Sequence, residues 1–217
     1  MTNNTCRHAH WLRLGLPLYD AQQVRRCVCG TLLHDTTHLL SCRAIQGGAS
    51  IRRHNDVVEI LAKYIRRAGG TADVEPPSFD KDSNKRVDID VFLGSLHLHI
   101  DVLITHPTAK TNHRHGMREL GAAIHGENLK IRKHKATADM VGATFVPYVV
   151  ETFGGVAPQA HSLNRKIAGF AEEHSVLVKK EDFSMMIVAE VAAAVQYGNL
   201  RLTTKGYQQS RPAKWFQ

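Results

Sequence analysis

Cysteine is scarce in this sequence, and long apolar runs are absent from it. No uninterrupted run of about 18 apolar residues occurs, so we expect no transmembrane helix and no membrane partner. The N-terminal residues MTNNTCRHAHW also lack the apolar core of a signal peptide. We therefore expect a reducing, intracellular compartment, in which the four cysteines are better suited to hold a metal ion than to form disulfides.

Acidic residues are also in short supply: there are 20 of them against 28 lysines and arginines, which gives a net charge of +8. Such an excess favours a polyanionic partner, most often nucleic acid, although a basic enzyme with another substrate can carry the same charge. The hydrophobic content of 43% is ordinary for a globular protein and argues against a disordered tail. The length suffices for one core domain and an appendage.

Hydrophobic periodicity predicts a helix, three strands, a second helix and a fourth strand. Apolar residues recur at helical spacing from residue 54 to residue 68, after which Gly69 and Gly70 end the helix. Residues 1–26 show no clear period. The other expected elements are strands at 71–75, 86–92, 96–104 and 144–151, a helix at 117–138, loops at 78–85 and 106–116, and two further helices at about 160–174 and 184–197.

Three of the four cysteines lie close together in the sequence, near a histidine. The order is Cys27, Cys29, His38 and Cys42, and four ligands of this kind bind Zn²⁺ tetrahedrally in structural sites. The spacing from His38 to Cys42 places both side chains on one face of a helical turn. His34 is a rival ligand on the expected loop, and buried free cysteines beside a chance histidine are the alternative. The pattern predicts a zinc knuckle.

Two alternating segments meet at Gly94-Ser95, a favourable two-residue hairpin turn. With that turn, Leu93 pairs with Leu96 and Asp90 pairs with His99. A register slip of one residue would exchange the two faces of the hairpin. One face carries Asp88, Asp90, His97, His99 and Asp101, and the other carries the expected core residues Ile89, Val91, Leu93, Leu96, Leu98, Ile100, Val102 and Ile104.

Asp88 and Asp101 face each other in this register. Opposed carboxylates repel unless a cation or a proton lies between them, and oxygen ligands of this kind suit Mg²⁺ or Mn²⁺. A solvated polar face is the alternative. We expect Asp90, His97 and His99 to surround such a site without ligating the ion, because Asp90 lies one pair nearer the turn.

Basic side chains are concentrated after the hairpin. They can bind the phosphate backbone, which supplies most non-specific DNA affinity. One lysine of the second helix, Lys130 or Lys133, can also reach the metal site. For Arg132 and Lys135 a solvated helix face is the alternative. The candidates for nucleic-acid binding are Arg53, His54, Arg114, Arg118, Arg132 and Lys135.

Several short motifs follow one another in a specific order and spacing. They are Leu14-Gly-Leu-Pro17, the Cys27/Cys29/His38/Cys42 set, Arg53-His-Asn55, Arg86-Val-Asp88, Asp101-Val-Leu-Ile104 and Lys130-Ile-Arg-Lys133. From about Leu12 to Gly155, the chain resembles the C-terminal region of the site-specific non-LTR retrotransposon proteins that carry a restriction-like endonuclease. The resemblance implies an α/β nuclease fold of the PD-(D/E)xK type, a mixed sheet flanked by helices, with an N-terminal CCHC zinc knuckle.

This resemblance implies a divalent-metal-dependent endonuclease that nicks or cleaves target DNA for retrotransposon integration. Its partners would be double-stranded DNA and the element's RNA or reverse transcriptase, its ions Mg²⁺ or Mn²⁺ and a structural Zn²⁺, and its location the nucleus. A zinc-dependent DNA-binding module with an inactive nuclease core and a Holliday-junction-resolving nuclease are the alternatives. The expected parts are a segment with the knuckle (1–50), the restriction-like core (51–157) and a C-terminal helical extension (158–217).

Matched by position, Asp88 corresponds to the first acid of the motif and Asp101 to the second, with the carbonyl of Val102 as a further metal ligand. The sequence departs from the motif at Val87, where proline is usual. It departs again at Leu103, where the simple motif has lysine.

In this family the lysine comes from the following helix, which corresponds to Lys130 or Lys133. His134 stands where tyrosine is common. Glu59 resembles the accessory acid of some such nucleases, with a solvated helix residue as the alternative. Asn55 fits a helix N-cap as well as a catalytic residue.

Overall fold

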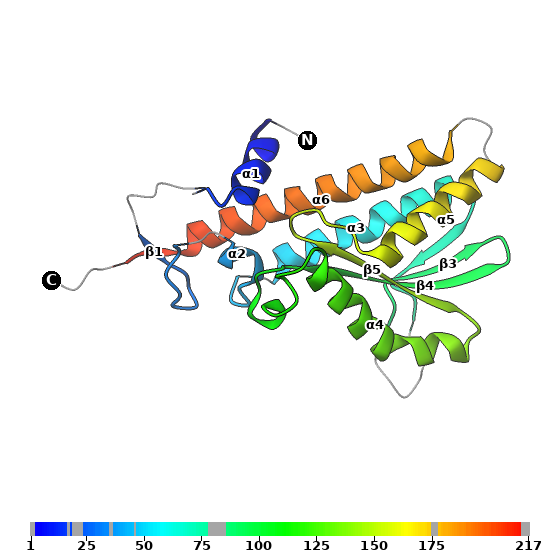
Figure 1. Cartoon of the computed structure of the whole chain (residues 1–217), viewed down its shortest axis with the longest axis horizontal. Coiled ribbons are helices and arrows are strands. Elements are labelled where there is room, and N and C mark those ends of the chain that lie inside the picture. The colour runs from blue at the N-terminus through cyan, green and yellow to red at the C-terminus, as the bar shows by residue number, and fades with distance from the viewer. Residues whose placement is uncertain are drawn as a thin grey trace.

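The structure is a computed structural model that describes residues 3–16, 18, 24–34, 37–45, 47–77, 86–174 and 178–213 (Figure 1). The loop expected at 78–85 lies outside these residues. From α3 to β5 the elements follow the predicted order of helix, three strands, helix and strand. In chain order they are α1 (Asn3–Arg13), β1 (Arg25–Arg26), α2 (His38–Ser41), α3 (Gly48–Arg67), β2 (Thr71–Val74), β3 (Ile89–Leu93), β4 (Leu96–Thr105), the 3₁₀ helix η1 (Lys110–Asn112), α4 (Gly121–Met140), β5 (Thr144–Glu151), α5 (Pro158–His174), α6 (Lys180–Gln209) and β6 (Arg211–Pro212).

A mixed four-stranded sheet forms the centre of the fold, with the strand order β2-β3-β4-β5. Neighbouring strands are antiparallel from β2 to β4, whereas β4 and β5 run parallel. The hairpin register is the predicted one, with Leu93 opposite Leu96 and Asp90 opposite His99. Gly94 supplies the positive φ of 58° that the turn requires. The register confirms the predicted pairing of the hairpin.

The apolar face of the sheet packs against α3 and α5, and α6 packs in turn on both helices (Figure 1). Ile89, Val91 and Ile100 are fully buried on this face. Leu163 of α5 and Val191 of α6 belong to the same hydrophobic core. The C-terminal helices therefore share one core with the sheet, and burial of each such side chain contributes roughly 1.5–3 kcal/mol.

On the opposite face of the sheet, α4 packs against β4 and β5 (Figure 1). A side chain at position 126 would meet Leu103 at 2.9 Å and Val149 at 3.2 Å, so Gly126 permits a close approach of helix and sheet. At the start of α4, the amide of Ala123 donates to the carboxylate of Glu151 (3.2 Å), which satisfies one of the helix-end donors. These contacts hold α4 over the polar side of β4.

A helix forms near the N-terminus, although residues 1–26 show no apolar period. α1 packs on α6, and His8 forms a 2.8 Å hydrogen bond with Thr203 of that helix. Because half of the buried positions are polar, the helical period is hidden in the sequence. The buried residues of α1 are Thr5, His8, Ala9 and Leu12.

Three helices differ in length from the expectation. α3 begins at Gly48, well before the expected start at residue 54, so Asn55 lies inside the helix and is not its N-cap. The helix expected at 117–138 begins at Gly121, because Leu120 adopts a left-handed φ of 53° that an α-helix does not accommodate. α6 spans 30 residues, well beyond the expected 184–197. By length and composition alone α6 could cross a membrane, with a mean hydropathy of 1.2 over an 18-residue window of which 39% is buried in the protein. Here it packs against α1, α2, α3 and α5.

The cysteine-containing segment is attached to the C-terminal half of α6. β1 pairs with β6, and α2 packs on α6. Leu39 and Ile45 fill the space over Gly206, where a side chain would meet each of them at 2.9 Å. The described residues thus place this segment on α6 rather than along an edge strand of the sheet.

Candidate functional site

The turn from Cys27 to Gly30 presents two of the four predicted zinc ligands. The amide of Gly30 donates to the carbonyl of Cys27 (2.8 Å), and the amide of Cys27 donates to the carbonyl of Thr31 (2.8 Å). Gly30 has a φ of 92°, which would be strained for any other residue. The one-residue gap between Cys27 and Cys29 is therefore accommodated by a tight turn that its own backbone closes.

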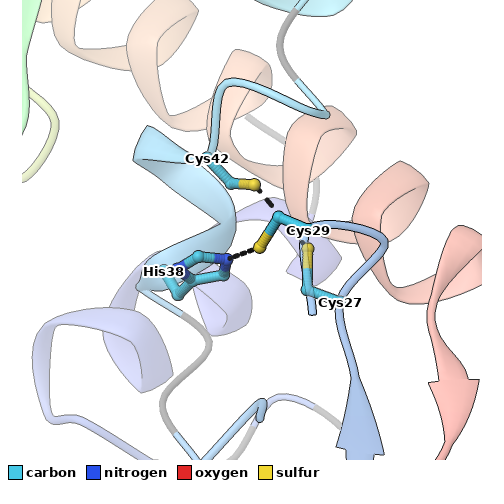
Figure 2. A group of neighbouring side chains, drawn as sticks. All are labelled: Cys27, Cys29, His38 and Cys42. Atoms are coloured by element: carbon cyan, nitrogen blue, oxygen red, sulfur yellow. Dashed lines mark hydrogen bonds between the residues drawn. The ribbon is translucent and has the colours of Figure 1, made fainter. Parts of the chain in front are cut away.

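The four predicted ligands meet in a single group, which we call the cysteine cluster (Figure 2). Cys29 Sγ lies 3.2 Å from His38 Nε2, and Cys27 Sγ lies 3.7 Å from Cys42 Sγ. One ligand atom from each residue lies within 4.8 Å of the others. Zn²⁺ with ligands at about 2.0–2.3 Å in tetrahedral geometry needs separations of this order, so the cluster can hold zinc. The rival ligand His34 is exposed and lies outside the group.

The two thiols of the turn differ in how readily they ionise. Burial raises the pKa of Cys27 to about 12. Hydrogen bonds with the side chain and the backbone of Thr31 lower the pKa of Cys29 to about 6. Zinc binds thiolates, so Cys29 offers a ready ligand, whereas Cys27 requires the cation itself to favour its charged form.

Asp88 lies directly before β3, where the regular ladder with β4 ends. Its amide donates to the carbonyl of Ile100 (3.0 Å), and its carboxylate Oδ2 accepts the amide of Val102 at 2.6 Å. The expected pairing of Asp88 with Asp101 is therefore wrong, because the ladder ends at Ile89 and Ile100. The Asp88 carboxylate instead accepts the amide of Val102, the residue after Asp101. The carboxyl groups of Asp88 and Asp101 nevertheless interact with each other.

Asp101 contacts two side chains of α4. Lys130 Nζ lies 2.9 Å from its carboxylate, and His134 Nε2 lies 3.1 Å from Oδ2. Positions 130 and 134 are one helical turn apart and share a face. Of the two candidate lysines, the structure thus brings Lys130 to Asp101, whereas Lys133 is exposed.

His54 reaches the same place from α3. Its Nε2 lies 3.1 Å from Asp88 Oδ2 and 3.3 Å from the carbonyl oxygen of Val102. The resemblance implies three metal-binding oxygen groups, from Asp88, Asp101 and Val102. Nε2 of His54, which was expected to bind nucleic acid, faces two of them. The group that we call the acidic cluster consists of His54, Asp88, Asp101, Val102, Lys130 and His134.

The protonation states in the acidic cluster depend on one another. Burial tends to raise the pKa of Asp88, but hydrogen bonds with His54 and Asp101 outweigh it, and the pKa lies below its usual value. Burial raises the pKa of Asp101 to about 6. The charge of Lys130 opposes this increase, and the charge of Asp88 adds to it. The hydrogen bond with Asp88 raises the pKa of His54 despite burial. Two carboxyl groups coupled in this way favour a proton or a cation between them.

Two predicted site residues lie away from the acidic cluster. Glu59 is exposed on α3 and lines a groove with Glu190 and Tyr197 of α6. Arg53 is only 4% exposed, and its Nη1 donates to Asn199 Oδ1 of α6 at 2.7 Å. Burial lowers the pKa of Arg53 to about 10. Arg53 thus joins two helices and is mostly covered, and the remainder of its surface lines the groove described below.

The remaining nucleic-acid candidates are exposed: Arg114, Arg118, Arg132 and Lys135. Lys135 forms an ion pair with Asp139 one turn further along α4 (2.6 Å). This pair is consistent with the alternative of a solvated helix face at Lys135.

A groove of about 810 Å³ lies between the cysteine cluster and the C-terminal end of β4. Its walls come from the segment around α2 on one side and from the end of β4 with η1 on the other. Exposed Arg43 and Lys110 lie on opposite walls. Basic walls of this kind attract a polyanion.

No metal-site role was expected for His54 or His134. His134 does carry a signal, because it lies one turn after Lys130 and must share its face of the helix. His54 carries none, since its contact with Asp88 depends on how α3 packs against the sheet.

No family model matches this chain, and no curated protein matches it. The cysteine cluster and the acidic cluster are the two groups with a defined chemistry that the sequence had singled out.

Proposed function

We propose that this chain is a divalent-metal-dependent DNA endonuclease with a restriction-like core and a zinc knuckle. The observation that carries the proposal is the meeting of Asp88, Asp101, Val102 and Lys130 in one place. These residues come from three separate segments: the position directly before β3, the middle of β4, and α4. They are the set that the resemblance to PD-(D/E)xK nucleases implies, with the lysine supplied by the following helix.

The oxygen groups of this set suit a hard divalent cation. Mg²⁺ and Mn²⁺ take carboxylate and carbonyl oxygens, and the residues offer the carboxylates of Asp88 and Asp101 and the carbonyl of Val102. His54 Nε2 lies within hydrogen-bonding distance of two of these groups, so both are directed at one point. A bound ion would polarise the scissile phosphate and lower the pKa of a water molecule.

Lys130 would supply a positive charge to the proposed site, and His54 would supply a group that can carry a proton. The Lys130 side chain is 22% exposed beside the buried Asp101, so its ammonium group is placed to stabilise negative charge on a phosphate oxygen. The His54 side chain is 32% exposed, and Asp88 raises its pKa. The hydrogen bond with Asp88 favours the protonated imidazole, which would hold a proton beside the proposed ion.

Double-stranded DNA is the proposed substrate. The net charge of +8, the basic groove and the exposed Arg114, Arg118 and Arg132 support a polyanionic partner. The cysteine cluster would bind a structural zinc ion and hold one wall of the groove. The element's RNA or reverse transcriptase as partners, the nuclear location and the role in integration rest on the resemblance alone.

Incubation with supercoiled plasmid tests this proposal. The chain should convert plasmid to nicked or linear product with Mg²⁺ or Mn²⁺, and EDTA should prevent it. Asp88→Asn and Lys130→Ala should lose activity, whereas Lys133→Ala, a change at an exposed lysine of the same helix, should retain it. Equal cleavage by Asp88→Asn and the unaltered chain would rule out the acidic cluster as the nuclease site.

A second candidate is a zinc-dependent DNA-binding module with an inactive nuclease core. His54 and His134 favour it, because two imidazoles already contact the carboxylates that a cation would need. This candidate predicts plasmid binding without cleavage at every Mg²⁺ and Mn²⁺ concentration. A four-way DNA junction added to the same assay would detect a junction-resolving nuclease through preferential cleavage of the branched substrate.

A further inference from the structure

One carboxylate and two imidazoles converge on the β3–β4 hairpin, beside the acidic cluster. Asp90 Oδ1 lies 2.7 Å from His97 Nε2 and 3.3 Å from His99 Nε2. One ligand atom from each of the three residues lies within 4.8 Å of the other two. The arrangement differs from the acidic cluster in its chemistry, because two of the three converging atoms are imidazole nitrogens.

The fold orients these side chains through local packing. Asp90 and His99 are directly paired across the hairpin, and His97 is paired with Phe92. The ring of His97 stacks on Phe92 with centroids 4.2 Å apart and planes at 8°. The ring of His99 is fully buried and meets His97 edge-on at 5.0 Å. Stacking and burial thus limit ring motion, and both Nε2 atoms face the same carboxylate oxygen, as a preorganised ligand set requires.

We propose that Asp90, His97 and His99 form a mononuclear binding site for a borderline divalent metal ion of the zinc class. Imidazole nitrogens favour Zn²⁺, Co²⁺ and Ni²⁺ over Mg²⁺. Two histidines and one carboxylate form a three-residue set that leaves a position open for water or another ligand. The side chains of Asp90 and His97 are 16% and 19% exposed, which gives the ion a route to the site from solvent.

This site is separate from the one proposed at Asp88 and Asp101. Asp88 and Asp90 are two positions apart in extended chain, a separation of about 6.6 Å. This is longer than the separation of about 3.5–4 Å between the ions of a two-metal centre. Because its ligands come from both strands, the ion at Asp90 would cross-link β3 to β4. It would therefore bind and stabilise the chain whether or not the acidic cluster has nuclease activity.

Metal counting on the full chain tests this inference. Protein dialysed against a slight excess of Zn²⁺ should retain one more zinc ion per chain than the Asp90→Asn and His97→Gln variants. His161→Gln, which alters an exposed histidine of α5, should retain as many as the unaltered chain. Cys42→Ser should also lose one ion, and the double variant Asp90→Asn/Cys42→Ser should lose two. Equal zinc content in the unaltered chain and both hairpin variants would overturn the proposal.

Cobalt spectroscopy assigns the ions to their sites. Co²⁺ bound at the cysteine cluster gives thiolate charge-transfer absorption, whereas Co²⁺ bound by imidazole and carboxylate gives only the weaker ligand-field bands. Asp90→Asn should remove part of the ligand-field absorption and leave the charge-transfer band unchanged. Asp90→Asn preserves the side-chain volume, whereas His97→Gln changes a ring near the turn of the hairpin. Circular dichroism of both variants shows whether either one is misfolded. Folded variants with the full cobalt spectrum would show that Asp90 only orients the two histidines through hydrogen bonds.

Discussion

The cysteine cluster and the acidic cluster are built in opposite ways. All four ligands of the first lie between residues 27 and 42, over a small core formed by Cys27, Leu39, Cys42 and Ile45. The second collects side chains from α3, from the position directly before β3, and from β4 and α4, on a sheet backed by the main hydrophobic core. Spacing alone therefore defines the first cluster, whereas the whole fold defines the second.

This difference predicts two responses to metal. Apart from its packing on α6, a segment with so few buried apolar side chains has little besides a bound metal ion to stabilise it, because metal binding supplies the folding free energy of small metal-binding modules. The acidic cluster is held by the core with or without an ion, so removing the proposed ion should stop the proposed cleavage and leave the fold intact.

Asp88→Asn should give the largest effect. The change removes a negative charge that the proposed ion needs, so the single-turnover rate of plasmid cleavage should fall by at least about 100-fold. DNA affinity should stay the same or increase, because a negative charge that faces phosphate is lost. Comparison of cleavage rate with fluorescence-anisotropy binding checks both expectations. A rate equal to that of the unaltered chain would leave the acidic cluster as a structural network of ion pairs and hydrogen bonds only.

Cys42→Ser should unfold the cysteine segment and spare the core. We expect the loss of about one zinc per chain and faster amide hydrogen exchange in residues 24–45, with unchanged protection in β3 and β4. Cys6→Ser is the matched control, because Cys6 is an exposed free cysteine of α1. If exchange in the sheet rose as much as exchange in the segment, the two regions would be one cooperative unit.

The two candidate lysines of α4 offer a finer comparison. Lys130→Ala should lower the cleavage rate by about 100-fold with little change in affinity, because its ammonium group lies at Asp101. Lys133→Ala should lower the rate by no more than about threefold, since an exposed lysine on a solvated face contributes at most a phosphate contact. The same single-turnover assay measures both, and a reversed order would exchange the roles of the two lysines.

Asp101 also gives the core a pH dependence at acidic pH, below the range in which the Cys29 thiol ionises. Its pKa is raised from 3.8 to about 6, so between these values the folded chain binds more protons than the unfolded chain. The stability of the metal-free protein should therefore fall as pH rises through this window, by at most about 3 kcal/mol. Thermal melts from pH 4 to pH 7 measure the slope, and Asp101→Asn should flatten it. An unchanged slope in that variant would assign the effect to another group.

Local features could be predicted from the sequence. The hairpin register followed from the turn at Gly94-Ser95 and from strict alternation, and the ligands Cys27, Cys29, His38 and Cys42 followed from spacing over a short segment. The register and the ligand set both depend on residues that are close in sequence, and the direction of successive side chains along a helix or a strand is known.

Features that depend on packing between distant elements could not be predicted. The contact of His54 with Asp88 requires the position of α3 over the sheet, and the burial of Arg53 requires α6, which begins more than a hundred residues later. α1 was missed because polar residues such as His8 occupy its buried face. In each case the residue is of a polar type that is usually exposed, and it is covered only because another element packs against it.

The smallest effect on cleavage should come from two arginines, one exposed and one buried. Arg132 is exposed on α4, so Arg132→Ala should weaken DNA binding by a few-fold and lower the slope of log affinity against log salt by about one, with the cleavage rate at saturation unchanged. Arg53 is buried and bonded to Asn199, so Arg53→Ala should cost stability, by about 1–3 kcal/mol, without changing the salt slope. Titrations at several salt concentrations, together with chemical denaturation, separate the two. If Arg53→Ala alone lowered the salt slope, the DNA would have to pass through the groove between the cysteine cluster and β4, because Arg53 lines that groove.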